Sequence, residues 1–340
     1  MTSFRALRDG IQRVNRAPAI LAGVWLMTAL VALPLAAAMR EQLQQNLGSS
    51  LEADTAASGV NYDWMQEFSA QATGIGTTFS PRAIGFGAVL DNLSTFIDNE
   101  RRPVLIAAAA LLYLMLWVFL SGGIIDRYAR DRAVRAQRFL WASSIYFVRF
   151  LRLAVAAAAI YGLLLRVVHP WLLGTVFDKL THDLTVERTA FAVRLALYAL
   201  LAAALAACNL LFDYAKVRAV VEDRRSMLGA AAAAVGFIRR NWTAATTLYA
   251  FDVLLWIAVL VLYAIIAPGA EPLGWSMWLG FAIGQLYVAA RLWVKLVFWA
   301  SEAALFQSRL AHAGYVAAAK PVWPESAAAE AIAGFTPRTP

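Results

Sequence analysis

The chain has 340 residues, of which 61% are hydrophobic and only 15% are charged, so it is far more apolar than a soluble domain of its size. Its net charge of +8 is spread over several loops and forms no single basic patch with interleaved aromatic residues, which excludes nucleic acid as the expected partner. A single cysteine, Cys208, excludes an intrachain disulfide and a thiolate metal cluster.

Six apolar runs, each close to the ~20 residues that cross a ~30 Å hydrocarbon core, set the fold class. They cover residues 18–38, 104–125, 148–168, 190–212, 244–267 and 276–298. Within lipid the backbone has to satisfy its own hydrogen bonds, and the runs show no period-two alternation, so we predict transmembrane helices. The predicted fold is all-α, with one polytopic membrane domain over residues 1–312 and a disordered cytoplasmic tail over 313–340.

An amphipathic, arginine-bearing segment precedes the first, third and fifth runs. The 3-4-3 spacing of its apolar residues gives a helix one apolar stripe, and an arginine follows two positions after the last of them. The first copy consists of Phe4, Leu7, Ile11, Val14 and Arg16, and the last consists of Leu228, Ala231, Val235, Ile238 and Arg240. The middle copy, with Leu140, Phe147 and Arg149, is weaker because Gln137 and Ser144 take two apolar places. We predict three repeats, each an amphipathic elbow followed by a helical hairpin, with these arginines contacting anionic lipid headgroups.

The first run has an alternative interpretation as a cleavable signal peptide. Four arginines precede it, and Ala36-Ala37-Ala38 after Pro34 resembles a cleavage site. The apolar stretch of ~20 residues is longer than a usual signal core. The segment before it also matches the last elbow, so we expect helix 1 to be retained.

The segment 40–103 is too apolar for a free linker and too short for an independent core of the usual kind. Its later part is amphipathic and predicts an interfacial helix on the outer leaflet; the residues that indicate this are Ile84, Val89, Leu93, Phe96 and Ile97. A lid on the outer ends of the spans and a ligand-binding cap are the alternatives. Farther along the chain, Pro170 is expected to end the third span.

The distribution of basic residues predicts the topology. With the N-terminus placed in the cytoplasm, 21 Lys and Arg residues fall in inner segments and 6 in outer segments. This excess is the positive-inside pattern of a multi-pass membrane protein, and it predicts that both termini are cytoplasmic.

Ionisable residues within the spans are the candidate binding residues, because such groups are costly in lipid. Asp252 lies about nine residues, or roughly 13 Å, into the fifth span. Arg291 and Lys295 lie one turn apart at a similar depth in the sixth, where Gln285 is at mid-depth. We predict that Asp252 pairs with Arg291, as a structural ion pair or as a proton- or substrate-coupling site. The alternative has both cations extending to the headgroups and Asp252 protonated. Gln285 and Asn209, in the fourth span, are expected to form hydrogen bonds between helices.

No catalytic constellation is visible in the sequence. The three histidines, His169, His182 and His312, have no partner spacing typical of a zinc site; a weak metal site at Asp178 and His182 is conceivable, with a solvated loop as the alternative. There is no phosphate-binding or dinucleotide-binding glycine motif. We therefore expect no enzymatic activity, no metal and no cofactor.

The arginine elbows at Arg16, Arg149 and Arg240, each before a pair of spans, resemble those of bacterial six-helix membrane families of unknown function. These include the membrane domain attached to some glycerophosphodiester phosphodiesterases. The likeness covers roughly 1–312 at the level of architecture, and this chain has no catalytic domain, so hydrolytic activity is not carried over. The resemblance implies a protein of the bacterial inner membrane without an established reaction. The expected function is that of a scaffold or accessory subunit with a protein partner. The alternative is a transporter or lipid-handling protein with a polar site between the fifth and sixth spans.

Overall fold

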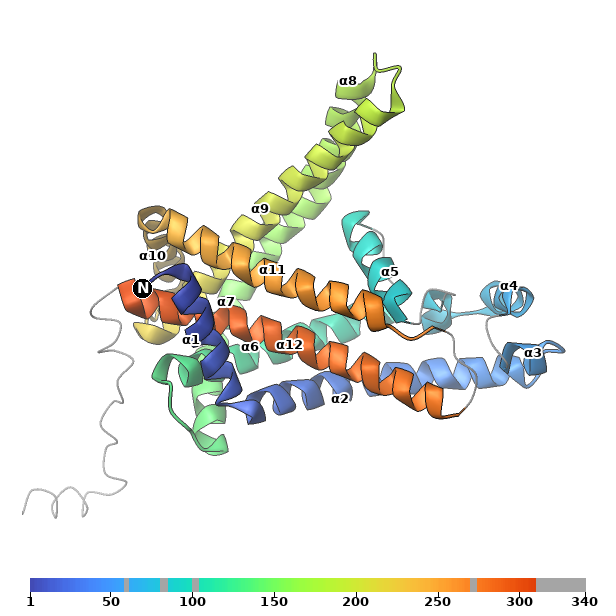
Figure 1. The fold of residues 1–340 in the computed structure, drawn as a ribbon, viewed down its shortest axis with the longest axis horizontal. Helices are drawn as coiled ribbons and strands as arrows, with labels where there is room; N and C mark the ends of the chain where they lie inside the picture. The colour runs from blue at the N-terminus through green and yellow to red at the C-terminus, as the bar shows by residue number, and fades with distance from the viewer. Residues whose placement is uncertain (58–60, 80–84, 100–103, 270–273, 310–340) are drawn as a thin grey trace, which may run out of the picture.

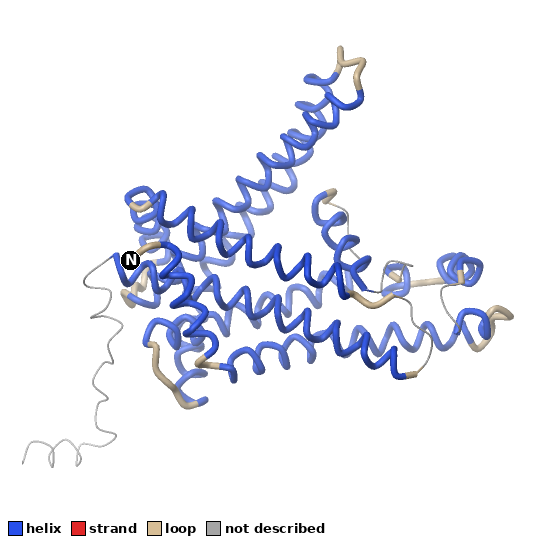
Figure 2. Tube along the Cα trace, viewed as in Figure 1, coloured by secondary structure: helices blue, strands red, loops and turns tan. Residues whose placement is uncertain are grey.

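The computed structural model describes the whole chain except residues 58–60, 80–84, 100–103, 270–273 and 310–340. The predicted tail over 313–340 therefore lies outside the described residues. Within the described residues the chain forms helices joined by short connections and contains no strand (Figure 2). Six of these helices are long and apolar enough to cross a membrane. The all-α fold class and the six spans are thus confirmed.

The first and last elbows are separate helices. Helix α1 covers Ser3–Asn15, with the Thr2 side chain as its N-cap, and α2 covers Pro18–Leu47. Pro18 suits the first position of a helix because its missing N–H would be unpaired there in any case. Likewise α10, Met227–Arg240, is divided from α11, Trp242–Ile266, at Asn241.

The middle elbow is not a separate helix, because α7 runs without a break over Ala136–Leu163. No proline or capping residue interrupts the helix between the predicted elbow and the span, so nothing forces a bend. The elbow and the span form one rod. The threefold repeat as a whole stays a prediction.

The third span also continues past Pro170, so the expectation that it ends there was wrong. The chain passes through two wider π-helical stretches, Leu164–Val168 and Trp171–Val176, and then through α8, Phe177–Thr181. Prolines are accommodated within helices where the local hydrogen-bond pattern changes, as it does in a π-bulge. Helix α9, Glu187–Val221, returns beside this rod, and the hairpin of α7, α8 and α9 diverges from the other spans (Figure 1).

The first part of the segment 40–103 forms a small cap on the end of α2. Its elements are α3, Ala53–Ala57, α4, Tyr62–Gln71, and the short helix Gly74–Thr78. Trp64, Met65 and Phe68 form its core against Leu43 and Leu47 of α2. Because α2 extends well past the predicted span, it supplies the apolar surface that this segment lacks on its own.

Helix α5, Gly85–Ile97, lies between the end of α11 and the π-helical part of the third span. At its start Gly85 has a φ of +62°, and a side-chain Cβ there would lie 2.3 Å from the carbonyl oxygen of Pro268, so only glycine fits. At its end the carbonyl oxygen of Ile97 lies 2.7 Å from Nε2 of His169. The helix leaves Leu90 and Phe96 exposed, and its place on the lipid surface stays a prediction.

The core is concentrated at the end of the bundle where α1 and α10 lie, which we call the elbow end (Figure 1). Here the last turns of α6, Val104–Arg130, and of α9 pack around α12, Trp275–Arg309, together with α1 and α10. The two described ends of the chain meet there, since Arg309 donates to the carbonyl oxygen of Met1 at 3.3 Å.

Candidate functional site

The four residues predicted to share a polar site are not brought together. Asp252 is fully buried, and its Oδ2 accepts a hydrogen bond from the Ser301 hydroxyl at 3.0 Å. Arg291 is exposed. Among the described residues no ion pair joins Asp252 to Arg291, so the predicted pairing is not present.

The register between α11 and α12 explains this difference. Tyr263 stacks on Tyr287 at 4.0 Å between ring centroids, and Tyr249 contacts Phe298 edge-on at 5.5 Å. These contacts place Asp252 beside the last turns of α12, more than one turn beyond Arg291 toward the elbow end. Equal depth from an assumed membrane boundary does not determine which residues face each other across a hairpin.

Lys295 instead lies over an aromatic ring of another helix. Its Nζ is 3.5 Å from the ring centroid of Trp117 on α6, which is a close cation–π contact. Trp117 in turn meets Trp299 edge-on at 5.5 Å. A cation resting on indole faces is stabilised there without a carboxylate partner.

Asp213 on α9 is the centre of a hydrogen-bond network. Its Oδ1 accepts from Lys216 at 2.7 Å and from the Trp299 indole at 3.0 Å, and its Oδ2 accepts from Asn209 at 3.0 Å. The Asn209 amide also donates to the Tyr249 hydroxyl at 3.3 Å, which confirms the hydrogen bond between helices expected of Asn209. The network ties α9, α11 and α12 together near the elbow end.

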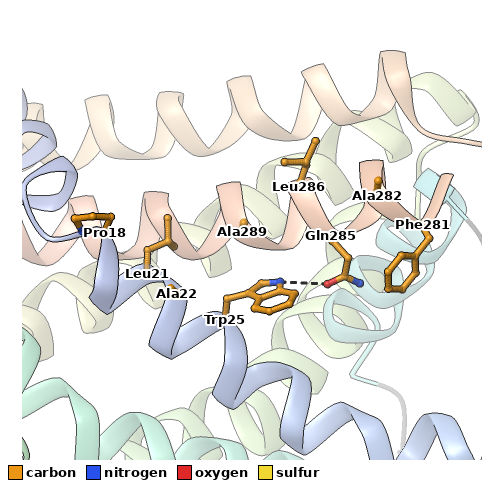
Figure 3. Close-up of a pocket in the computed structure, with 9 residues that line it drawn as sticks. All are labelled: Pro18, Leu21, Ala22, Trp25, Phe281, Ala282, Gln285, Leu286 and Ala289. Atoms are coloured by element: carbon orange, nitrogen blue, oxygen red, sulfur yellow. Dashed lines mark hydrogen bonds between the residues drawn. The ribbon is translucent and has the colours of Figure 1, made fainter. Parts of the chain in front are cut away.

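Gln285, the fourth predicted residue, lies in an apolar groove between α2 and α12 (Figure 3). The groove has a volume of about 570 Å³. It is lined by Pro18, Leu21, Ala22, Trp25, Phe281, Ala282, Gln285, Leu286 and Ala289, and we call it the chain groove. The Trp25 indole donates to Oε1 of Gln285 at 3.2 Å, so the expected interhelical bond of Gln285 is also confirmed. Among these lining residues, the Trp25 indole N–H and the Gln285 amide are the polar side-chain groups, and the first donates to the second.

Two of the three elbow arginines bind a carboxylate in the structure. Arg16 pairs with Asp131 at 3.0 Å, and Arg149 pairs with Asp223 at 2.9 Å. Asp131 follows the end of α6 and Asp223 follows the end of α9, and both have a positive φ, of 44° and 49° respectively. Arg240 donates to a carbonyl oxygen of its own helix. If Arg16 and Arg149 contact lipid headgroups as predicted, they do so while they are paired with Asp131 and Asp223 of the same chain.

Sequence reasoning missed Glu302, which is 1% exposed on α12. The second span of each predicted repeat, which is α6, α9 or α12, carries one buried acidic residue near the elbow end. These residues are Asp126, Asp213 and Glu302. This recurrence was visible in the sequence for the first two. Glu302 was overlooked because it lies past 298, where the apolar run ends, although α12 continues to Arg309.

Asp178 lies on α8 and His182 caps its end, so the two residues are one helical turn apart, and a metal site there stays a prediction; His312 lies outside the described residues. Among the described residues, no three or more His, Cys, Asp or Glu side chains are grouped so that they could hold a metal ion. His169 is buried against α5, where its ring nitrogen contacts the Ile97 carbonyl.

The chain matches no family model, and neither a curated protein nor a solved structure resembles it significantly. The likeness of the arginine elbows to the membrane domain of certain phosphodiesterases thus remains a prediction from the sequence.

Proposed function

We propose that this integral membrane protein is a non-catalytic lipid-binding protein whose chain groove holds one acyl chain of an anionic phospholipid. The observation that carries the proposal is the groove itself, an apolar hollow between the spans α2 and α12. Its volume falls within the ~300–1,000 Å³ typical of small-molecule sites, and its one polar side chain, Gln285, already has a partner in Trp25.

The dimensions suit a chain that enters from the elbow end. From Pro18 to Trp25 the groove follows α2 for roughly 10 Å, at about 1.5 Å per residue. At the elbow end, the Trp293 indole donates to the Asn15 side chain at 2.9 Å and joins α12 to the α1–α2 junction. An acyl chain can therefore lie along the groove with its polar end beside this junction.

A basic residue lies where the headgroup of such a lipid would be. Arg16 is two residues before Pro18, and 59% of its side chain is exposed despite its ion pair with Asp131. A guanidinium has five N–H donors, so it can bind a phosphate and a carboxylate together. An acyl chain that moves from the bilayer into the groove stays in a hydrocarbon environment, so this step favours no particular lipid. We therefore expect the headgroup contacts to determine which phospholipid binds.

The test uses the full chain in nanodiscs that contain a phospholipid with a photoreactive acyl chain. Crosslinks are expected at Trp25 and Leu286, more with phosphatidylglycerol than with phosphatidylcholine. The substitution Ala22→Phe fills the groove and should remove these crosslinks. Ala19→Phe is the matched control, because Ala19 is exposed on α2 outside the groove lining. Equal labelling of the two variants would contradict the proposal.

A role as a scaffold or accessory subunit is the second candidate. It is supported by the diverging hairpin of α7, α8 and α9, which leaves large apolar side chains exposed along its length, among them Val155, Ile160, Phe191 and Leu195. Copurification of a stoichiometric partner, lost when Phe191 and Leu195 are changed to Ser, would favour this role.

We further propose that the protein lies in the bacterial inner membrane with both termini in the cytoplasm. The excess of basic residues in the inner segments supports this orientation. Fusions of alkaline phosphatase to the loop at 182–186 should be active, and fusions after residue 309 should be inactive. If the fusions after residue 309 were active and those at 182–186 inactive, the orientation would be opposite to the proposed one.

A further inference from the structure

A hydrogen bond crosses the chain groove from one helix to the other. The Trp25 indole of α2 donates to Oε1 of Gln285 on α12 at 3.2 Å, and both residues belong to the groove lining (Figure 3). We call this pair the groove bridge. A hydrocarbon chain has no group that could replace either partner, and an indole N–H or amide oxygen without a partner is costly in apolar surroundings. A chain in the groove therefore leaves the bridge closed.

The groove bridge lies at the far end of the groove, away from the elbow end. On α2 the lining begins at Pro18, where the helix starts, and Trp25 is its last residue. On α12, which runs in the opposite direction (Figure 1), Phe281 lies one turn beyond Gln285 and meets Trp278 edge-on at 6.4 Å. Rings from both helices thus close the far end, whereas the lining toward the elbow end has no aromatic side chain.

The distance to this bridge limits how much of an acyl chain the groove holds. From Pro18 to Trp25 the groove is roughly 10 Å long, at about 1.5 Å per residue of α2. With C–C bonds of ~1.5 Å, an extended hydrocarbon chain advances about 1.3 Å per carbon, so this length accommodates about eight carbons. One leaflet of a hydrocarbon core of ~30 Å is about 15 Å deep. An acyl chain that spans its leaflet is therefore longer than the groove and has to leave it at the bridge.

We infer that the groove bridge selects acyl chains that bend about nine carbons from the ester group, as a chain with a cis double bond at that place does. The inference rests on the proposed function, in which the chain enters from the elbow end. A straight chain meets the indole and the amide at the bridge, and it can turn aside only by fixing some of its single bonds in a bent arrangement. A cis double bond holds the bend permanently, so a chain that carries it is preorganised for the groove.

The surface beside the bridge gives the bent chain a way out. Leu26 of α2 and Leu286 of α12 follow the two bridge residues in the sequence, and they are 53% and 68% exposed. Both side chains are apolar, so the part of the acyl chain beyond the bend can leave the groove across them and return to the bilayer. The bridge therefore discriminates by the shape of the chain, at the opposite end of the groove from the headgroup contact proposed for Arg16.

The test uses the full chain in phosphatidylcholine nanodiscs that contain a trace of photoreactive phosphatidylglycerol, and the crosslink is measured at Leu286. Unlabelled phosphatidylglycerols compete with this probe. Their chains have the same length and one double bond each, which is cis at carbon 9, trans at carbon 9 or cis at carbon 6. We expect the cis-9 lipid to compete at least several-fold better than the other two. The trans-9 chain is straight, and the cis-6 chain bends before it reaches the bridge.

Variants distinguish chain selection from a purely structural role of the bridge. Gln285→Leu removes the acceptor and Trp25→Ala removes the ring, and each should bring the ratio of cis-9 to trans-9 competition close to one. Trp141→Ala, at an exposed ring of α7 outside the groove lining, should keep the ratio of the unmodified chain. A preference that both bridge variants retain would overturn the inference. Equal competition by the cis-9 and trans-9 lipids would also overturn it, and the proposed function would stand if Ala22→Phe still removed the labelling. Labelling that Ala22→Phe does not remove would refute the proposed function itself.

Discussion

Substituting Gly10 by alanine tests how closely the first elbow packs on the last span. A Cβ at position 10 would lie 2.6 Å from the backbone nitrogen and 2.8 Å from Cα of Ser301, whereas ordinary contacts begin at 3.4 Å. Both are backbone atoms of α12 and cannot rotate away, so α1 has to move outward. Overpacking of this kind costs about 1–3 kcal/mol.

The matched control is Gly23→Ala in α2, where a Cβ would have nothing within 4 Å. Both substitutions gain the same helix propensity, up to ~1 kcal/mol. The difference between the two free energies of unfolding therefore isolates the cost of the close contact. We expect Gly10→Ala to be less stable than Gly23→Ala by about 1–3 kcal/mol, measured by tryptophan fluorescence during unfolding in mixed micelles. Equal stabilities would refute the close packing of α1 on α12.

Three further predictions concern the cap and an elbow. Trp64→Ala removes the centre of the cap core and should cost about 3–5 kcal/mol locally, seen as faster proteolysis at 48–79 while the spans stay protected. A double-mutant cycle on Arg149→Gln and Asp223→Asn should give a coupling of ~0.2–1 kcal/mol, because this ion pair is partly exposed; a larger value would contradict that reasoning. Hydrogen bonds from Thr55 and Asn61 lower the pKa of Glu52 below its usual 4.5, so the stabilisation is present above pH 4.5 and is lost as acidification passes the lowered pKa. Protection of the cap should fall in that range, and Thr55→Ala should weaken the dependence.

The six spans were predictable because each is a long apolar run without period-two alternation, although the first also carries the pattern of a signal peptide. The separate first elbow was predictable as well, since Pro18 marks a helix start. The fused middle elbow was not, because its apolar stripe is the same whether the helix bends at its end or continues. The prediction that the third span ends at Pro170 was wrong for a related reason. Sequence patterns do not show where a π-helical stretch will accommodate a proline.

The candidate site was harder to predict than the fold. Asp252 was recognised as a buried charge, but its partner depends on the register of α11 and α12, which the rings of Tyr263 and Tyr287 help to fix. Glu302 was not considered, because it lies past residue 298, where the apolar run ends. Its burial comes from α1 and from the last turns of α9, which are far away in the sequence.

The contact of α1 with α12 has a consequence for how the chain is made. The residues of α1 leave the ribosome long before those of α12, on which they pack. Helix α1 therefore lacks its packing partner until α12 has been synthesised and inserted. Long-range contacts of this kind form late and slowly. A chain stalled before α12 would expose the stripe of α1 that is buried in the complete fold. Quality-control proteases could recognise an incomplete chain by this exposed stripe.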